Sequence, residues 1–409
     1  MTATSGSRIA VLDLIRGVAI LGILAVNIEG FAGPIAATLS PDWNGPVSGP
    51  SHFAFAAVLI LFEGKMRALL SLLFGASMLL FIESAEAADR DGDRLQLRRL
   101  CWLAVIGYLH SALAWWGDIL FTYAFAGFFA LLLRHLSPRT MVAAALMAFA
   151  IWHGGNALEN LPSVRSEIQF IAGTASPSEQ ATLWQERARD HQDTLAEQRR
   201  EQGGYLPLVR HKFSEEAALP LIMAVNTFGE VLPLMLLGMA LFRSGFFTGG
   251  WPAGKLRGIA LWGIGAGGVT TIAITAFAWT HGFPPRMMNA ILAWWMALPH
   301  LAMALGFAAV LVLKAPVLGN SALGRRIIAV GRMALSNYLG CTLMMTALFY
   351  GWGLGLMGKV PESLYWPFIL GGWVVMLWAS PLWLRRYRQG PVEWLWRSLT
   401  TWQFQIFRR

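Results

Sequence analysis

Long apolar segments recur along this chain, and they constrain its fold more than any other feature. The first covers residues 9–31 and is long enough to cross a bilayer, which takes about 20 residues. Hydrophobic residues make up 56% of the sequence and charged residues only 13%, well below the roughly 25% of soluble domains. The sequence therefore predicts an all-α fold, a polytopic helical bundle embedded in a membrane.

About ten membrane spans are predicted, with both termini on the cytoplasmic side. Lys and Arg gather in alternate short connections, as expected for cytoplasmic loops. This pattern indicates a multi-pass protein of the cytoplasmic membrane, with the lipid bilayer as the first partner. Residues 53–62 are too short to cross and are expected to lie at the interface or to re-enter. The spans are expected at residues 9–31, 65–83, 101–116, 119–134, 140–157, 217–242, 258–280, 287–313, 333–351 and 366–384.

One charged stretch interrupts the apolar pattern. It divides the chain into spans one to five (1–157), an external helical insert (158–215), spans six to ten (216–384) and a basic amphipathic tail on the cytoplasmic side (385–409). Within the insert, residues 176–179 (Ser-Pro-Ser-Glu) predict a capping box and a helix that continues to about Gln202. The insert is interpreted either as a lid over the external mouth or as a solvated spacer.

The first span carries three polar side chains: Asp13, Arg16 and Asn27. A charge at membrane depth costs about 2.5–3.5 kcal/mol on insertion scales, so such residues are retained where something pairs with them or uses them. Asp13 and Arg16 are neighbours on one helix face, and Asn27 returns to that side after about three turns. They form either a structural ion pair or part of a cavity that binds a substrate or cofactor.

Further charges lie near the second and sixth spans. Glu63 and Arg67 have the i, i+4 spacing of a helical salt bridge, with Lys65 between them. They are interpreted either as anchors at the membrane interface or as part of an external acceptor site. Glu230 is expected to be buried and needs a partner, for which Arg16 is one candidate.

Histidine supplies the candidate for acid–base chemistry. The pKa of a free imidazole, about 6.5, allows proton exchange near neutrality. His110 lies in an apolar span, and Asp118 follows eight residues later, where it would orient His110 or cap the next helix. His110 could equally be a packed structural residue. His52, after the first external loop, is a second candidate base, and His300 follows a proline in mid-span.

Several classes of protein are excluded by absent motifs. There is no phosphate-binding Walker loop, no Gly-rich dinucleotide motif, no His-Glu-x-x-His metal spacing and no Gly-x-Ser-x-Gly elbow. The chain therefore does not look like an ATPase, an α/β-hydrolase or a zinc enzyme, and no metal is expected. The net charge of +9 follows the membrane topology and indicates no nucleic-acid partner.

Five segments, in order along the chain, together resemble the YeiB-like family of bacterial membrane proteins, a domain of unknown function. The insert at 158–215 has no counterpart among them. The segments are residues 12–23 with Asn27, residues 64–75, His110 with residues 116–120 and Tyr123, residues 331–338, and residues 390–397.

That family looks like a branch of the transmembrane acyltransferase superfamily, which includes the heparan-α-glucosaminide N-acetyltransferase type. The resemblance implies transfer of an acyl group from cytoplasmic acyl-CoA, for example acetyl-CoA, to a small-molecule, glycan or lipid acceptor in the cell envelope. In those relatives the catalytic histidine precedes the second span, so His52 competes with His110 for this role.

The resemblance also assigns roles to individual residues. His110 or His52 would deprotonate the acceptor, with Asp118 orienting the base. Arg16, with Arg332 or with Arg325 and Arg326, would engage the phosphates of CoA. The cofactor set is Asp13, Arg16, Asn27, Arg332 and Asn337, and the acceptor set is Glu63, Lys65, Arg67, Tyr123 and Glu230.

Two other functions remain open from the sequence. Arg16, Glu230 and His300 would also suit a transporter or flippase for a small anionic or lipid-like solute, and the chain would also serve as a non-enzymatic membrane partner. The oligomeric state is open, with a homodimer among the options. The enzymatic interpretation requires that Arg16, His110 and Asp118 converge on one hydrated chamber.

Overall fold

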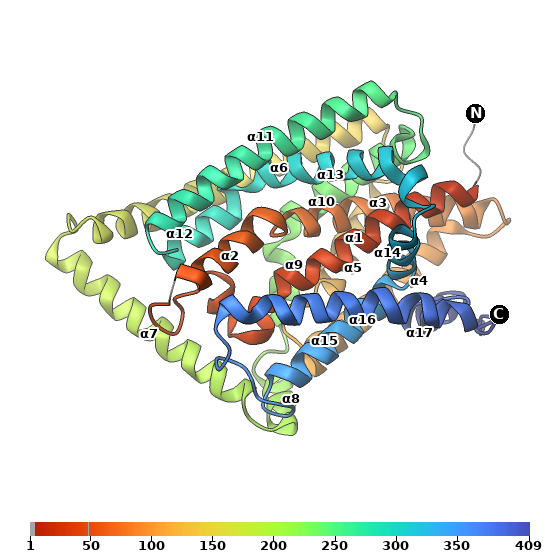
Figure 1. Ribbon diagram of the computed structural model, residues 1–409. Coiled ribbons are helices and arrows are strands. Elements are labelled where there is room, and N and C mark those ends of the chain that lie inside the picture. The colour runs from red at the N-terminus through yellow and green to blue at the C-terminus, as the bar shows by residue number, and fades with distance from the viewer. Residues whose placement is uncertain (1–4, 48) are drawn as a thin grey trace.

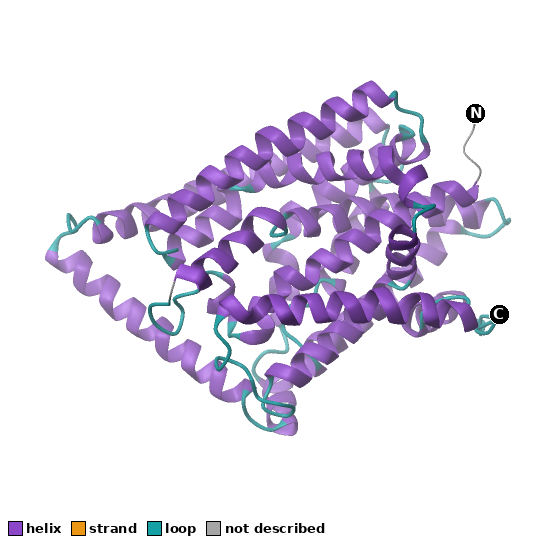
Figure 2. Cartoon of the chain, in the orientation of Figure 1, coloured by secondary structure: helices purple, strands orange, loops and turns teal. Residues whose placement is uncertain are grey.

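The computed structural model of this protein describes residues 5–47 and 49–409, and every regular segment in these ranges is helical (Figures 1 and 2). The predicted all-α class is therefore confirmed. The helices form one elongated bundle, in which the beginning of α1 and the end of the chain lie at the same end (Figure 1). The side of the membrane that each end occupies stays a prediction.

The first half of the chain contributes six α-helices and one short 3₁₀ helix, η1. They are α1 (Ser5–Ala32), η1 (Ile35–Thr38), α2 (Gly49–Leu61), α3 (Lys65–Glu86), α4 (Gly92–Leu113), α5 (Leu120–Leu132) and α6 (Pro138–Ile171). The insert then adds α7 (Pro177–Glu201) and α8 (Tyr205–Ser214).

The second half is more broken. It contains α9 (Leu219–Asn226), α10 (Phe228–Arg243), η2 (Phe246–Thr248), α11 (Ala253–Thr280), α12 (Pro285–Ala290), the π-helical turn η3 (Ile291–Trp295), α13 (Ala297–Leu318), α14 (Ala322–Arg332), α15 (Ala334–Phe349), η4 (Glu362–Leu364), α16 (Tyr365–Arg386) and α17 (Pro391–Thr401).

By length and apolar composition, the described residues contain six helices able to cross a membrane, or up to eight if two bent pairs each count as one span. The bent pairs are α9 with α10, at 62°, and α14 with α15, at 85°. The predicted number of about ten is not reached, because α5 has only 13 residues and α4 is not among the candidates. The short helix expected at 53–62 is present as α2, which ends at Leu61 before α3 begins at Lys65. By length and composition the two together form one 38-residue candidate span, Gly49–Glu86, and a position at the interface or a re-entrant path for α2 stays a prediction.

Glycines allow the central helices to pack backbone to backbone. A Cβ atom at Gly75 of α3 would lie 2.0 Å from the carbonyl oxygen of Met235 in α10, and a Cβ at Gly331 of α14 would lie 1.9 Å from that of Asp13 in α1. No side chain fits at such distances. Replacing either glycine would force the helices apart, so these positions fix the arrangement of the helices that carry the polar residues.

The helix predicted in the insert is confirmed. Ser176 and Glu179 form the capping box, and α7 then runs to Glu201, with Gln202 as its C-cap. The fifth span is longer than expected, because α6 continues past residue 157 to Ile171. From there α7 crosses the end of the bundle that lies opposite the chain ends (Figure 1).

Contacts from α7 reach both halves of the chain. The Glu197 carboxylate accepts a hydrogen bond from the Ile35 amide at 3.0 Å, and Glu201 accepts one from the Tyr350 hydroxyl at 2.8 Å. The Gln202 side chain donates to the Met357 carbonyl at 2.8 Å. A solvated spacer would not make these bonds, and the insert is therefore a docked cover.

Candidate functional site

The most enclosed acid–base pair of the described chain joins α4 to the turn before α5. His110 Nδ1 and Asp118 Oδ1 lie 2.8 Å apart, and the two side chains are only 4% and 1% exposed. Asp118 Oδ2 also accepts the Phe121 amide at 2.7 Å, so the residue caps α5 and orients His110 at the same time. Both sequence interpretations of Asp118 are therefore present in one side chain.

The second ring nitrogen of His110 has no hydrogen-bond partner in the described part of the chain. Nε2 is buried, and such unsatisfied buried atoms are uncommon in folded proteins. The Tyr338 ring lies beside the imidazole, with centroids 5.2 Å apart. Tyr338 is itself fixed, because its hydroxyl donates to the Gly117 carbonyl and accepts from the Ile119 amide.

Beyond Tyr338 lies a small cavity between α1, α15 and α16. Asn27, Asn337, Tyr338 and Thr342 line its polar side, and its volume of about 10 Å³ is enough for roughly one water molecule. Asn337 donates to the Val330 carbonyl and to Ser380 Oγ. The structure thus brings Asn27 and Asn337 together, as expected for two members of one polar set.

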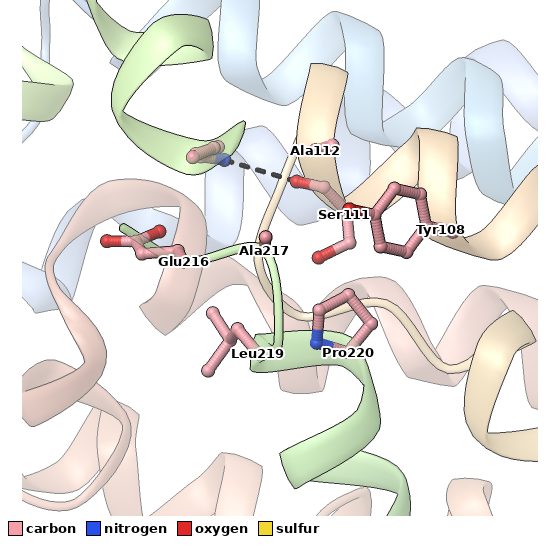
Figure 3. Close-up of a pocket in the computed structure, with 8 residues that line it drawn as sticks. Tyr108, Ser111, Ala112, Glu216, Ala217, Leu219 and Pro220 are labelled. Atoms are coloured by element: carbon pink, nitrogen blue, oxygen red, sulfur yellow. Dashed lines mark hydrogen bonds between the residues drawn. The ribbon is translucent and has the colours of Figure 1, made fainter. Parts of the chain in front are cut away.

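The insert closes over the C-terminal end of α4. Lys212 of α8 donates to the Ser111 carbonyl at 3.4 Å, and the Tyr205 hydroxyl donates to the Leu113 carbonyl at 3.0 Å. A cavity of about 10 Å³ remains beside this contact, between Tyr108, Ser111 and Glu216 (Figure 3). His110 therefore lies beneath a segment held by only a few bonds.

A second histidine–carboxylate pair lies near that same end of the bundle. His52 Nε2 is 3.2 Å and 3.3 Å from the two carboxylate oxygens of Asp42, and these side chains are 17% and 28% exposed. The rings of Trp279 and Phe283 lie beside His52. Sequence reasoning selected His52 but missed Asp42, since no helical spacing links them.

Arg67 forms the main buried ion pair of the middle of the bundle. It contacts both carboxylate oxygens of Glu230, at 3.0 Å and 3.4 Å, and also Glu63 at 3.3 Å. The predicted Glu63–Arg67 bridge is thus confirmed, whereas the suggestion that Arg16 pairs with Glu230 is wrong. Glu230 lies on α10 and faces α3, which carries Arg67, whereas Arg16 lies on α1.

Lys65 and Tyr123 are more enclosed than a site at the membrane interface would require. Lys65 is fully buried, and its ammonium group donates to the Leu59 carbonyl at 2.6 Å, where α2 ends. Tyr123 donates to the Arg67 carbonyl at 3.2 Å. Neither side chain faces outward, so the interpretation of Lys65 as an interfacial anchor is wrong.

Two histidines join the Arg67–Glu230 pair around a cavity of about 10 Å³. His153 of α6 and His300 of α13 both line it, and the Nε2 atom of each is buried without a partner among the described residues. The His300 ring lies against Gly64, where even a Cβ atom would come within 1.8 Å of Nδ1. Sequence reasoning did not connect His153 to this group, because its neighbours come from four separate helices.

Arg16 lies in the N-terminal half of α1 and is paired there. It donates to Asp13 at 2.7 Å, as predicted, and to Ser77 of α3 at 2.8 Å. Asp13 also interacts electrostatically with Arg332, and Arg16 does so with Arg99.

Arg99 lies at the centre of a basic group. Its guanidinium stacks on Trp396 of α17 at 4.3 Å from the ring centroid and also interacts with Arg397. The carboxylate of Asp13 lies near Arg332, and that of Glu393 lies near Arg397. Four arginines, Arg16, Arg99, Arg332 and Arg397, thus gather in one region, a concentration of positive charge that would suit an anion.

Glu393 of α17 ties the tail to α15. Its carboxylate accepts hydrogen bonds from the Leu335 and Ser336 amides and from the Ser336 hydroxyl. Burial raises the pKa of Glu393, and the bonds from Ser336 oppose that effect. Arg332 is directed to the same tail, since it donates to the Arg388 carbonyl at 3.1 Å. The sequence placed both segments in one family motif set but could not show that they touch.

The contacts do not support one chamber shared by Arg16, His110 and Asp118. Arg16 is bonded to Asp13 and Ser77, while His110 and Asp118 are bonded to each other. Of the cavities described above, none is lined by Arg16 together with His110. The polar residues form separate groups along the bundle axis.

Buried ionisable groups on apolar helices define this molecule as a helical, multi-pass membrane protein. Residues 241–403 match the family described as "Protein of unknown function (DUF418)". "Uncharacterized protein YeiB" of Escherichia coli (strain K12) is 30% identical over 395 residues, which is 96% of each chain. "Uncharacterized protein YxaH" of Bacillus subtilis (strain 168) is 29% identical over 417 residues, 98% of this chain and 96% of its own.

The chain therefore belongs to the YeiB-like family, and the resemblance seen in its motifs is confirmed. The two relatives match along almost their full length. No solved structure matches the chain.

Proposed function

We propose that this protein is a membrane acyltransferase that moves an acyl group, such as acetyl, from acyl-CoA to an acceptor in the cell envelope. One observation carries the proposal: His110 is oriented by Asp118 through Nδ1, while Nε2 is buried and unsatisfied within the described chain. A carboxylate-oriented imidazole with one available nitrogen is the arrangement of a general base.

In the proposed reaction the acceptor hydroxyl or amine approaches His110 Nε2. The imidazole removes its proton as the acceptor oxygen or nitrogen attacks the thioester carbonyl. A bond from the acceptor to the acyl carbon forms, the carbon–sulfur bond breaks, and CoA leaves as the thiol after receiving the proton from the imidazole. Asp118 stabilises the imidazolium that exists between these two proton transfers.

The basic group at the other end of α1 supports acyl-CoA as the donor. Guanidinium groups bind phosphates through two parallel hydrogen bonds, and Arg16, Arg99, Arg332 and Arg397 gather in one region. Arg16 and Asn27 are eleven residues apart on α1, or about 16 Å along the axis. CoA phosphates held by Arg16 would direct the thioester arm along α1 toward Asn27 and Tyr338.

The contacts of the described residues exclude a preformed chamber shared by Arg16, His110 and Asp118, so the proposal requires motion that opens a path to His110. The cavity beside Asn27 holds about 10 Å³, far less than an acyl-pantetheine arm, and the insert covers the C-terminal end of α4. We therefore assign α8 of the insert the role of a lid, which opens by moving away from α4 with loss of the contacts of Lys212 and Tyr205, while α7 stays docked. When the lid is closed, the enclosed His110–Asp118 pair is shielded from water, which limits hydrolysis of the thioester.

The test uses purified protein, acetyl-CoA labelled in the acetyl group, and cell-envelope extract as the source of acceptor. The proposal expects label in an envelope product and an equal amount of free CoA thiol. Neither bound CoA nor transfer to extract, with protein that remains folded, would refute it.

The second candidate is a transporter for a small anionic or lipid-like solute, and the cavity at Arg67 favours it. There Arg67, Glu230, His153 and His300 surround one small space, as in the proton relays of membrane pumps. Proteoliposome uptake that depends on an ion gradient, with acetyl-CoA left intact, would support this function over acyl transfer.

A further inference from the structure

A groove between α14 and α16 holds three arginines that the proposed function does not use. Its volume is about 280 Å³, larger than the cavities around His110 or Arg67. Arg325 and Arg326 of α14 line one side, and Arg385 of α16 lines the other. The remaining lining residues are Ala322, Trp378, Pro381 and Leu382, so no carboxylate is among them.

Backbone carbonyls hold two of the guanidiniums in place. Arg325 donates to the Asn320 carbonyl at 2.6 Å, and Arg326 donates to the Leu377 carbonyl at 3.1 Å. Each guanidinium has five N–H donors, so both retain donors for a ligand. Ala322 is the first residue of α14, and the Ser321 side chain caps that helix, which adds the positive end of a helix dipole to the groove.

An exposed apolar row leads into the groove along α16. Val374, Trp378 and Leu382 follow one another at intervals of four residues and are 66%, 63% and 45% exposed. Residues at this spacing lie one above the other on a helix face. Arg385 follows on the next turn, at the end of the candidate span Glu362–Arg386. The face is therefore apolar along the span and basic at its end.

We propose that this groove binds an anionic glycerophospholipid. Its phosphate would contact Arg325, Arg326 and Arg385, and an acyl chain would lie along the row that ends at Leu382. A soluble phosphate would use the arginines alone and leave the apolar row without a role. A zwitterionic lipid would bring a cation to a groove with no carboxylate to receive it. Basic pockets between membrane helices at the cytoplasmic face bind anionic headgroups in this way.

The groove gives Arg325 and Arg326 surroundings different from those expected from sequence. They were candidates for binding CoA together with Arg16, yet they line a space with Arg385, whereas Arg332, six residues after Arg326, interacts with Asp13. The site is thus separate from the proposed donor site, and loss of lipid binding leaves the acyltransferase proposal intact.

Native mass spectrometry of the full-length protein in a non-ionic detergent tests the site. Phosphatidylglycerol and phosphatidylcholine with the same acyl chains are titrated separately. The test variant is Arg325→Gln with Arg385→Gln. The control is Arg257→Gln with Arg386→Gln, which removes the same charge from exposed positions outside the groove. At about 1 kcal/mol for each basic residue, phosphatidylglycerol should bind roughly 30-fold more weakly to the test variant.

The control variant should keep its affinity within threefold, and phosphatidylcholine should bind weakly to all three proteins. Equal affinities for both lipids, or an unchanged affinity in the test variant, would overturn the proposal. Inorganic phosphate is added as a competitor at millimolar concentration. If it displaces phosphatidylglycerol completely, the groove takes a free phosphate and the lipid assignment is wrong. The single variant Arg385→Gln, at an exposed position, repeats the test if the double variant misfolds.

Discussion

Two histidine–carboxylate pairs, His110–Asp118 and His52–Asp42, share their chemistry and differ in their surroundings. The first is almost fully enclosed, is bonded through Nδ1 and keeps Nε2 buried. The second is partly exposed and is bonded through Nε2 to both oxygens of its aspartate. The comparison teaches that a histidine and an acid in contact do not by themselves define a catalytic base. Enclosure and the nitrogen left available distinguish the two.

The largest expected difference between the two pairs is in the acyl-transfer rate after each histidine is replaced. His110→Gln should lower the rate of acyl transfer by about 100-fold or more, because general bases contribute roughly 10²- to 10⁴-fold. His52→Gln should stay within threefold of the wild-type rate. Transfer of labelled acetyl to envelope extract measures both, and equal melting temperatures would show that both variants fold. The opposite ranking would move the base to His52.

The next largest effect is expected for Arg16 of α1, in the proposed donor site. Arg16→Gln should raise the KM for acetyl-CoA about tenfold with kcat nearly unchanged, since a lost charge-assisted hydrogen bond costs about 1.5–3 kcal/mol. Arg94→Gln, at an exposed position near the start of α4, is the matched control. A fall in kcat with an unchanged KM would contradict the assignment of Arg16 to the donor.

The two aspartates sharpen the comparison further. Asp118→Asn should lower the transfer rate roughly tenfold. The neutral amide stabilises the imidazolium less well than the carboxylate does, and its NH₂ group can donate to Nδ1, which favours the tautomer of His110 that cannot act as a base through Nε2. Asn still accepts the Phe121 amide, so the α5 cap is retained. Asp42→Asn should have little effect on the rate. Similar losses in both variants would show that the enclosed pair is not special.

The smallest expected effect concerns the cover over His110. Burial, together with the neighbouring Glu197, raises the pKa of Glu201 to about 8. In the unfolded chain Glu201 loses its proton near pH 4.5, so between pH 5 and 8 the folded state binds more protons. Stability of the docked insert should therefore fall as the pH rises through this window.

Limited trypsin digestion of the insert measures that effect. The wild-type protein should be cut a few-fold faster at pH 8.5 than at pH 6, after correction for the pH dependence of trypsin. Glu201→Gln keeps an acceptor for Tyr350 and should remove the difference, while Glu215→Gln, at an exposed position, should retain it. If the wild-type protein is cut at the same rate at both pH values, protonation of Glu201 does not control the stability of the docked insert.

Local spacing carried the predictions that proved correct. The Asp13–Arg16 and Glu63–Arg67 pairs follow from helical periodicity, and the capping box of α7 follows from four consecutive residues. His110 and Asp118 are only eight residues apart, across the short connection between α4 and α5, which placed them within reach.

Contacts between distant segments could not be predicted in this way. The pairing of Arg67 with Glu230, the meeting of His153 with His300, and the capping of α15 by Glu393 each depend on how helices cross. Asp42 lies in an irregular loop, where spacing gives no direction to a side chain. The shared chamber failed as a prediction for the same reason, because hydropathy says that a polar residue is buried but not which helix it faces.

The most direct test of acyl transfer across the bundle uses proteoliposomes with uniformly oriented protein. Labelled acetyl-CoA is supplied only on the side of the α1 N-terminus, and envelope acceptor only on the other. The account predicts acetylated acceptor on the far side and one CoA thiol released on the near side for each acetyl transferred, with both lost in His110→Gln. Intact acetyl-CoA on the near side, with gradient-dependent movement of solute, would contradict it.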